Sequence, residues 1–182
     1  RIVRHLPARG TIGIFNRSHY EDVLVARVSP DVLAAQRIPG AKAGPALWEE
    51  RFESIRCLER HLARNGTVIR KFWLNVSKDE QRRRFLDRID ERRSQWKFSA
   101  EDIEKRRRRE DYVRAYSDAL TATSRPWAPW YAVPADDKPH ARLEVARIVL
   151  ETLESLDLEW PRPSKAERAE MKRARRELER DE

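Results

Sequence analysis

Short apolar runs alternate with longer amphipathic segments along the first 160 residues of the chain. Three of the runs are rich in β-branched and aromatic residues and are bounded by glycine, proline or polar residues, which is typical of buried strands in a parallel sheet. These runs cover residues 11–15 (TIGIF), 67–76 (TVIRKFWLNV) and 130–135 (WYAVPA). The pattern therefore predicts three strands.

Apolar positions at helical spacing predict the helices that flank these strands. Pro45 and Asn65-Gly66 bound the strongest helix, and Ser77 stands three residues before Glu80, which is the spacing of a capping box. The expected helices cover 1–9 (the end of a helix), 19–28, 45–64, 78–93, 104–122 and 139–156, with a loop over 29–44. The helix over 139–156 aligns Leu143, Ala146, Leu150 and Leu153 on one face.

Strands that alternate with helices imply right-handed crossovers and a parallel sheet, which is an α/β fold. In such sheets ligands bind beyond the carboxyl ends of the strands. Polar residues follow each predicted strand at this edge, over residues 16–18, 75–78 and 136–138. We therefore expect the functional site there.

Residues 161–182 have a different character. Pro161 and Pro163 interrupt the preceding helix, and the sequence that follows is charged with hardly any apolar face. A solvated helix and a disordered end both fit this composition. We expect one α/β domain over residues 1–160 and a charged tail over 161–182.

The chain has 182 residues and a net charge of +8, with arginine far ahead of lysine. This charge favours a polyanionic partner, such as nucleic acid, a phosphate chain or a nucleotide, although a solvated basic surface is the alternative. Cys57 is the single cysteine, so an internal disulfide is excluded, which fits a reducing cytoplasm. No run reaches the roughly 18 apolar residues of a membrane span. We expect a cytoplasmic protein without a membrane partner.

The first candidate site is the sequence FNRSHY, which follows the predicted strand at 11–15. The guanidinium of Arg17 matches phosphate oxygens, and the hydroxyls of Ser18 and Tyr20 could add donors. The alternative is an ordinary helix cap made by Asn16 or Ser18, with Arg17 in solvent. The residues alone leave both open.

The second candidate is the arginine-rich segment, which we define as residues 78–109. Its arginines are Arg82, Arg83, Arg84, Arg88, Arg92, Arg93 and Arg106 to Arg109. A solvated helical face explains such a run, and a mobile flap that closes over phosphates explains it as well. Neighbouring arginines on a helix point in different directions, so not all of them can reach one ligand.

Two further features lie in the sequence SRPWAPWYAVPADDK. Trp127 and Trp130 could stack on a nucleobase or could close a hydrophobic core. Asp136 and Lys138 lie where a helix begins, and we include all four as candidates for the nucleotide side. The four histidines lack metal-ligand spacing, and no G-x-x-x-x-G-K-[ST] phosphate loop occurs.

Four separated blocks, in order, resemble the family-2 polyphosphate kinases: GTIGIFNRSHYEDVLVARV, KFWLNVSKDEQRRRFLDRID, QWKFSAEDI and TSRPWAPWYAVPADDKPHARL. The resemblance runs over residues 1–160 and leaves out the tail. It implies a P-loop kinase-like three-layer fold, with a parallel sheet and a helical, arginine-rich lid over about 78–109. It also implies phosphoryl transfer between inorganic polyphosphate and nucleoside mono- or diphosphates of the ADP/AMP or GDP/GMP type, with Mg²⁺, in a homo-oligomer.

The resemblance also assigns roles to residues. Arg17 would contact phosphate, and Asn16 stands where many members have a metal-binding aspartate, so a weaker, neutral Mg²⁺ ligand is implied. The remaining implied phosphate contacts are Ser18, Tyr20, Lys71, Arg82, Arg83 and Lys97. The family's Walker A loop precedes the segment that matches here. Because the chain opens with Arg1, we expect a fragment of a longer protein, or else a truncated and inactive one.

Three other functions stay open at this point. An ATP-dependent nucleotide kinase would be active without polyphosphate. A basic nucleic-acid-binding module would fit the charge and the tail, although no RRM, helix-turn-helix or zinc-finger pattern is present. A non-catalytic remnant that serves only as a subunit partner is the third.

Overall fold

The computed structural model describes residues 2–180 of the chain. Contacts divide the chain into two compact units, of which the first ends at Val145 and the second is Ala146–Glu182. The division falls inside α7 (Lys138–Glu154), and the domain over 1–160 with a charged tail over 161–182 stays a prediction. Each unit is described by itself.

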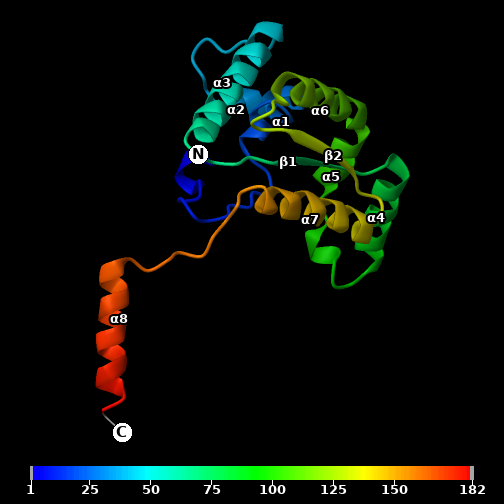
Figure 1. The fold of residues 1–182 in the computed structure, drawn as a ribbon. Coiled ribbons are helices and arrows are strands. Elements are labelled where there is room, and N and C mark those ends of the chain that lie inside the picture. The colour runs from blue at the N-terminus through cyan, green and yellow to red at the C-terminus, as the bar shows by residue number, and fades with distance from the viewer. Residues whose placement is uncertain (1, 181–182) are drawn as a thin grey trace. The chain divides into compact units, whose positions relative to one another are not determined.

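The first unit is built on a small parallel sheet. β1 (Lys71–Asn75) pairs with β2 (Trp130–Pro134), in a register that sets Lys71 beside Trp130 and Asn75 beside Pro134 (Figure 1). Both strands lie inside the predicted runs at 67–76 and 130–135, and the parallel pairing confirms the predicted α/β class. The connection runs through α4 (Lys78–Asp90), η3 (Gln95–Lys97), α5 (Ala100–Arg107) and α6 (Arg109–Thr123).

The predicted strand at 11–15 is wrong. Within residues 2–180 the sheet has two strands, and the TIGIF run joins neither of them. Ile14 is 92% exposed, and Pro7 instead packs on Gly13, where an added Cβ would lie 3.0 Å from the proline Cδ. An apolar, β-branched run forms a strand only where another strand supplies hydrogen-bond partners, and these described residues supply none to it.

The helix predictions hold best for the longest segments. α3 (Pro45–Arg64) has the predicted bounds, with Pro45 in its first turn and Asn65 as its C-cap. The helix expected over 104–122 is divided at Arg108 into α5 and α6.

Shorter helices near the amino terminus differ more from the prediction. The expected helix over 19–28 is two short pieces, η2 (His19–Asp22) and α1 (Val25–Val28), and the expected loop contains α2 (Pro30–Ala35). The helical end expected over 1–9 is only the 3-10 turn η1 (Ile2–His5), and residue 1 lies outside the described residues.

Two apolar clusters lie on the two faces of the sheet. Successive strand residues point to opposite faces, so Trp130 packs on the first cluster and Tyr131 on the second. The first cluster consists of Tyr20, Val23, Leu24, Val28, Phe52, Ile55, Ala115 and Ala119. The second contains Val133, Ala135 and Ala141, with Val145 packed against it. The first unit is therefore layered as helices, sheet and the start of α7 (Figure 1).

The buried face of α7 is not the face that the leucine pattern suggested. Ala141 and Ile148 are buried, whereas Leu143 and Leu150 are exposed. Small side chains such as Ala141 and Ala135 let the start of the helix approach the sheet closely. Most of the predicted stripe therefore faces solvent, and only Leu153 is half-buried.

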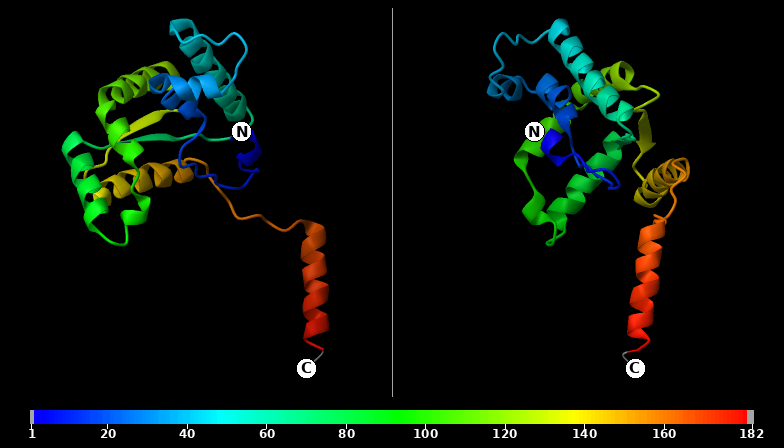
Figure 2. Two further views of the ribbon diagram at one scale, coloured as in Figure 1. Left: turned by 180° about the vertical axis from the view of Figure 1, so that it is seen from behind. Right: turned by 60° about the vertical axis from the view of Figure 1, so that its left-hand side comes forward.

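The second unit ends in α8 (Lys165–Leu178), a single uninterrupted helix in both views of Figure 2. Ser164 and Glu167 form a complete capping box at its start, and every described residue from 164 onward is exposed. Of the two alternatives for the tail, a solvated helix and a disordered end, the structure shows the solvated helix. In the described part of the chain no helix is both long and apolar enough to cross a bilayer.

Candidate phosphate-binding site

The carboxyl ends of β1 and β2 meet at one edge of the sheet, as their parallel pairing requires. The backbone N–H of Ala135 donates to the carbonyl of Asn75 at 2.8 Å, and that of Ser77 donates to Asp136 Oδ1 at 2.7 Å. Two of the three predicted polar groups therefore lie together. The third, at residues 16–18, follows a segment that is not a strand.

Arg84 fastens the start of α4 to the end of β2. Its Nη2 donates to the carbonyls of Ala135 and Asp136 at 2.6 and 3.0 Å, and its Nε donates to Glu80 Oε1 at 2.6 Å. Together with Arg83, it holds the pKa of Glu80 at about 2. The N–H and hydroxyl of Ser77 lower the pKa of Asp136. We call Ser77, Glu80, Arg84 and Asp136 the β2–α4 junction.

Two other arginines of the arginine-rich segment are also structural. Arg106 donates to the carbonyl of Lys78 and to Gln81 Oε1, both at 2.8 Å, and so fastens α5 to α4. Arg88 pairs with Asp102 at 3.3 Å across the same two helices. These guanidiniums are half-buried and already satisfied, which removes them from the set that could hold a ligand.

Several of the other cations of this segment face solvent. The side chains of Arg82, Arg92 and Arg93 are exposed and make no hydrogen bond or ion pair within residues 2–180. Lys97 is exposed as well, with its ammonium 5.1 Å from the centre of the Trp96 ring. Arg83 is exposed but is held by Glu80 and Asp87, at 2.6 and 2.9 Å.

Arg17 has an unusual backbone and an open side chain. Its φ of 67° lies in the left-handed region, and its side chain is 79% exposed. The guanidinium is 3.4 Å from Glu21 and close enough to Tyr116 to oppose the rise that burial causes in the pKa of that phenol. Ser18 accepts from the backbone N–H of Tyr20 at 3.3 Å, so its hydroxyl oxygen caps η2.

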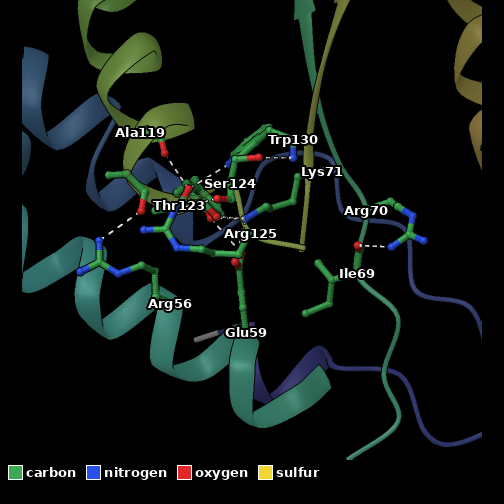
Figure 3. Close-up of polar contacts among 12 residues, drawn as sticks. Arg56, Glu59, Ile69, Arg70, Lys71, Ala119, Thr123, Ser124, Arg125 and Trp130 are labelled. Carbon is green, nitrogen blue, oxygen red and sulfur yellow. Dashed lines mark hydrogen bonds and ion pairs between the residues drawn. The ribbon is translucent and has the colours of Figure 1, made fainter. Parts of the chain in front are cut away.

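Tyr20 and Lys71 lie in the core and form one buried network. Figure 3 shows Lys71 with two of its partners, Glu59 and Thr123. Lys71 Nζ donates to Glu59 Oε2 at 2.7 Å, to the Tyr20 hydroxyl at 2.8 Å and to the carbonyl of Thr123 at 3.0 Å. The Tyr20 hydroxyl donates to Glu59 Oε1 at 2.8 Å. Burial raises the pKa of Glu59 and lowers that of Lys71, and their mutual bond opposes both shifts. All three polar groups are satisfied, so neither Tyr20 nor Lys71 presents a donor to a surface ligand.

The two tryptophans have their faces occupied. Trp130 donates from Nε1 to Thr123 Oγ1 at 3.0 Å, and its ring meets Tyr20 edge-on, with 4.8 Å between the ring centres. Arg60 lies over the Trp127 ring, 5.5 Å from its centre. Lys138 is exposed at the start of α7.

The structure joins some of the predicted residues and leaves others apart. Arg17, Arg82, Arg83 and Lys97 are all cations that donate hydrogen bonds and do not pair with one another, so only a shared anionic ligand could join them. A cavity of about 350 Å³ lies elsewhere, against α1 and α6, where Asp111 and Asp118 already pair with its arginines. The convergence of Arg17 and the solvent-facing cations on one ligand therefore stays a prediction.

A Mg²⁺ ion would find few protein ligands here. Within residues 2–180 no three acidic, histidine or cysteine side chains gather closely enough to hold a metal. Mg²⁺ commonly keeps several waters and takes phosphate oxygens, with one or two protein ligands. The exposed amide of Asn16 fits such a single ligand, and the donor set matches an ion held mainly by its substrate.

Sequence reasoning did not identify the role of Arg84. Nothing in the run RRR distinguishes the middle arginine from the last one, because the distinction depends on the end of β2, about fifty residues later. The available signals were the Ser77–Glu80 spacing and the position of Asp136 after the last strand. Together these two would have suggested that α4 and β2 share a cap.

Comparison with known proteins agrees with this geometry. Residues 1–161 match the family model for Polyphosphate kinase 2 (PPK2). The chain is 52% identical to an ADP-polyphosphate phosphotransferase of Rhodopseudomonas palustris over 179 residues, which is 98% of this chain and 62% of that protein. It is 43% identical over 166 residues to an AMP/ADP-polyphosphate phosphotransferase of Meiothermus ruber, covering 91% of this chain and 58% of the relative.

A solved structure gives the same result for the fold. The crystal structure of Polyphosphate Kinase 2 from Arthrobacter aurescens TC1 superposes with a TM-score of 0.81 at 40% identity, over 93% of this chain and 57% of that one. The chain thus spans about three fifths of the length of these relatives. With the family model matched over most of its length, the chain belongs to the polyphosphate kinase 2 family.

Proposed function

We propose that this protein transfers phosphoryl groups between inorganic polyphosphate and nucleoside mono- or diphosphates. The observation that carries the proposal is the set of unpaired cations on the arginine-rich segment, in a chain of the polyphosphate kinase 2 family. The relatives named for ADP and for AMP/ADP support adenine nucleotides as substrates, and a relative in Mycobacterium tuberculosis is named for GDP. We propose a cytoplasmic homo-oligomer in which residues 78–109 act as a lid.

The proposed reaction is an in-line displacement. A terminal phosphate oxygen of the nucleotide attacks the end phosphorus of polyphosphate. A new P–O bond forms as the adjoining anhydride P–O bond breaks, and the shortened chain leaves with the electron pair; nucleotide-driven synthesis is the reverse. Catalysis of such transfers consists mostly of positioning and charge neutralisation. Arg17 would lie on the transferred group, and Arg82 and Lys97 on the polyphosphate chain.

The basic residues of the arginine-rich segment fall into a structural set and a set that is available to bind phosphate. The satisfied arginines Arg84 and Arg106 hold the segment in shape, and the unpaired cations remain available to phosphate. Each charge-assisted hydrogen bond to phosphate contributes about 1.5–3 kcal/mol. Bound Mg²⁺ would neutralise further phosphate charge, with Asn16 as its protein ligand.

A binding and turnover experiment tests the proposal. Polyphosphate affinity should fall steeply with salt, by the ion-release effect known for nucleic acid. In a chain that includes the family's Walker A loop, ATP should form from ADP only when polyphosphate is present. Arg82→Ala and Lys97→Ala should each weaken polyphosphate binding about tenfold or more. Arg83→Ala is the matched control, because Glu80 and Asp87 already hold that guanidinium, and its effect should be smaller.

Three outcomes would contradict the proposal. Salt-insensitive polyphosphate binding would remove the role of the cations. Phosphorylation of AMP by ATP without polyphosphate would favour an ordinary nucleotide kinase. Equal binding of short DNA or RNA in competition would favour a nucleic-acid-binding module.

A further inference from the structure

The helix α8 carries one apolar stripe that no described residue of its own unit covers. Met171, Ala174 and Leu178 are spaced by three and four residues, and Met171 and Leu178 are 58% and 70% exposed. This spacing is that of positions a and d in a coiled-coil heptad, with Met171 and Leu178 at a and Ala174 at d. A stripe of this width fits the seam between two helices.

The charges beside the stripe are sorted by sign. Glu170 and Glu177 follow one edge, at heptad position g, and Arg168 and Arg175 follow the other, at position e. Each pair is seven residues apart, so the acidic edge and the basic edge run along the same two turns. A merely solvated helix has no need of this separation.

The sorting distinguishes between the two ways in which a pair of α8 helices could lie. In a parallel pair, position g of one helix meets position e of the next heptad in the other. Glu170 would then meet Arg175 of the partner subunit, twice by symmetry. In an antiparallel pair like edges would face each other, setting glutamate against glutamate and arginine against arginine.

We propose that α8 pairs with α8 of a second copy of this chain, in parallel, along the Met171–Ala174–Leu178 stripe. The same patch serves on both subunits, as two-fold symmetry requires. The capping box forms the start of the helix before any pairing. Among the described residues, the partner of the Arg175 side chain is the exposed Glu179 of its own helix, at 2.8 Å. Because an exposed ion pair contributes little to stability, exchange of the Arg175–Glu179 pair for a pair with Glu170 of the partner subunit costs little free energy.

The comparison with Rhodopseudomonas palustris bears on the same helix. The family model ends at residue 161, but the aligned 179 residues leave out only three residues of the chain. Most residues of α8 therefore align with that relative, although they lie outside the range of the family model. A seam of about one heptad is short, so we expect a modest, salt-sensitive contribution to self-association.

Charge reversal tests the proposal on the whole chain by analytical ultracentrifugation. Glu170→Arg alone and Arg175→Glu alone should each weaken self-association, because each sets like charges against one another in a homodimer. The double variant Glu170→Arg/Arg175→Glu should restore the wild-type affinity. An equimolar mixture of the two single variants should form heterodimers, since both of its intersubunit pairs are again of opposite sign.

A seam variant and a cross-link complete the test. Met171→Lys/Leu178→Lys should weaken self-association at least about tenfold without loss of helicity. With Cys57 replaced by serine, Leu178→Cys should form an intersubunit disulfide, because only a parallel pair brings both copies of position 178 together. The proposal is overturned if the wild-type chain is monomeric, or if either single charge reversal leaves self-association unchanged or strengthens it. It is also overturned if neither the double variant nor the mixture of single variants regains the wild-type affinity.

Discussion

The helices α4 and α8 start alike but bond differently. Both are arginine-rich, and both begin with a serine that accepts the backbone N–H of a glutamate three residues later, at 3.1 Å in α4 and 3.2 Å in α8. In α8 the Glu167 carboxylate closes the box by accepting from Ser164 N–H at 2.7 Å. In α4 the Ser77 N–H instead donates to Asp136, far along the chain, and Glu80 binds Arg83 and Arg84.

The difference teaches how one local motif acquires two roles. Where α4 meets the end of β2, the Ser77 N–H bonds the distant Asp136 in place of Glu80. Arg84 becomes a structural residue there because it bonds the carbonyls of Ala135 and Asp136. Along α8 the described residues of its own unit supply no such partner, so the polar contacts seen there are local and the charges keep the order of the sequence. The predictions below test this contrast, from the largest expected effect to the smallest.

The largest effect is expected where long-range bonding is complete, at the buried Lys71–Glu59 pair. Glu59→Leu leaves a buried ammonium unpaired and should lower the free energy of unfolding by about 3–5 kcal/mol, measured by denaturant titration. Replacement of both partners, in Glu59→Leu/Lys71→Met, should recover most of this loss. If the double variant is no more stable than the single one, the unpaired charge is not the cause.

A smaller loss is expected at the β2–α4 junction. Arg84→Met deprives the carbonyls of Ala135 and Asp136 of their donor and should cost about 1–2 kcal/mol. Arg83→Met, one residue away and more than half exposed, should change the free energy of unfolding by less than about 0.5 kcal/mol. Equal losses would mean that the junction is no stronger than the surface pairs.

The two capping serines offer a matched comparison. Ser77→Ala should cost about 1 kcal/mol of the free energy of unfolding of the first unit. Ser164→Ala removes the equivalent bond, but its effect should be confined to α8, as faster hydrogen exchange over residues 165–178 with an unchanged unfolding transition of the first unit. A shift of that transition in Ser164→Ala would show that α8 is not bonded only locally.

The smallest effect concerns acid. Arg83 and Arg84 hold the pKa of Glu80 at about 2, below its ordinary value of 4.5, so the contribution of the pairs to stability is complete above pH 4.5 and is lost as the pH falls through 2. The pKa of Glu167 is lowered too, by Ser164 alone. Carboxyl NMR titration should show Arg84→Met raising the pKa of Glu80 and leaving that of Glu167 unchanged. A Glu80 that titrates at its ordinary value would contradict the geometry.

Much of the fold could be predicted where the signal is local. The proline and the asparagine-glycine pair at its ends define α3, and the parallel pairing of β1 with β2 follows from the alternation of strands and helices. The strand predicted for the TIGIF run was wrong because a strand forms only beside a partner strand. The leucine stripe of α7 failed because the packing distance to the sheet favoured alanine instead.

The candidate site divides in the same way. Sequence pattern and resemblance drew attention to Arg17, Arg82 and Lys97, and their exposure keeps them available to phosphate. Tyr20, Lys71 and Trp130 were included by position but lie in the core. The sequence of these residues would be the same at a surface site and in the core. Burial decides whether the hydroxyl, the ammonium and the indole bind a ligand or bond within the protein.

By itself, then, the sequence determined the family, the long helix α3, the positions of β1 and β2, the serine caps and the heptad charges of α8. Each of these depends on residues within a few turns of one another or on motifs along the chain. The tertiary structure alone decided that Lys71 is bonded to Glu59, that Arg84 holds the end of β2, and which arginines remain unpaired. The reason is physical: a charged side chain takes its role from the partners and the solvent around it, and folding brings those partners from distant parts of the chain.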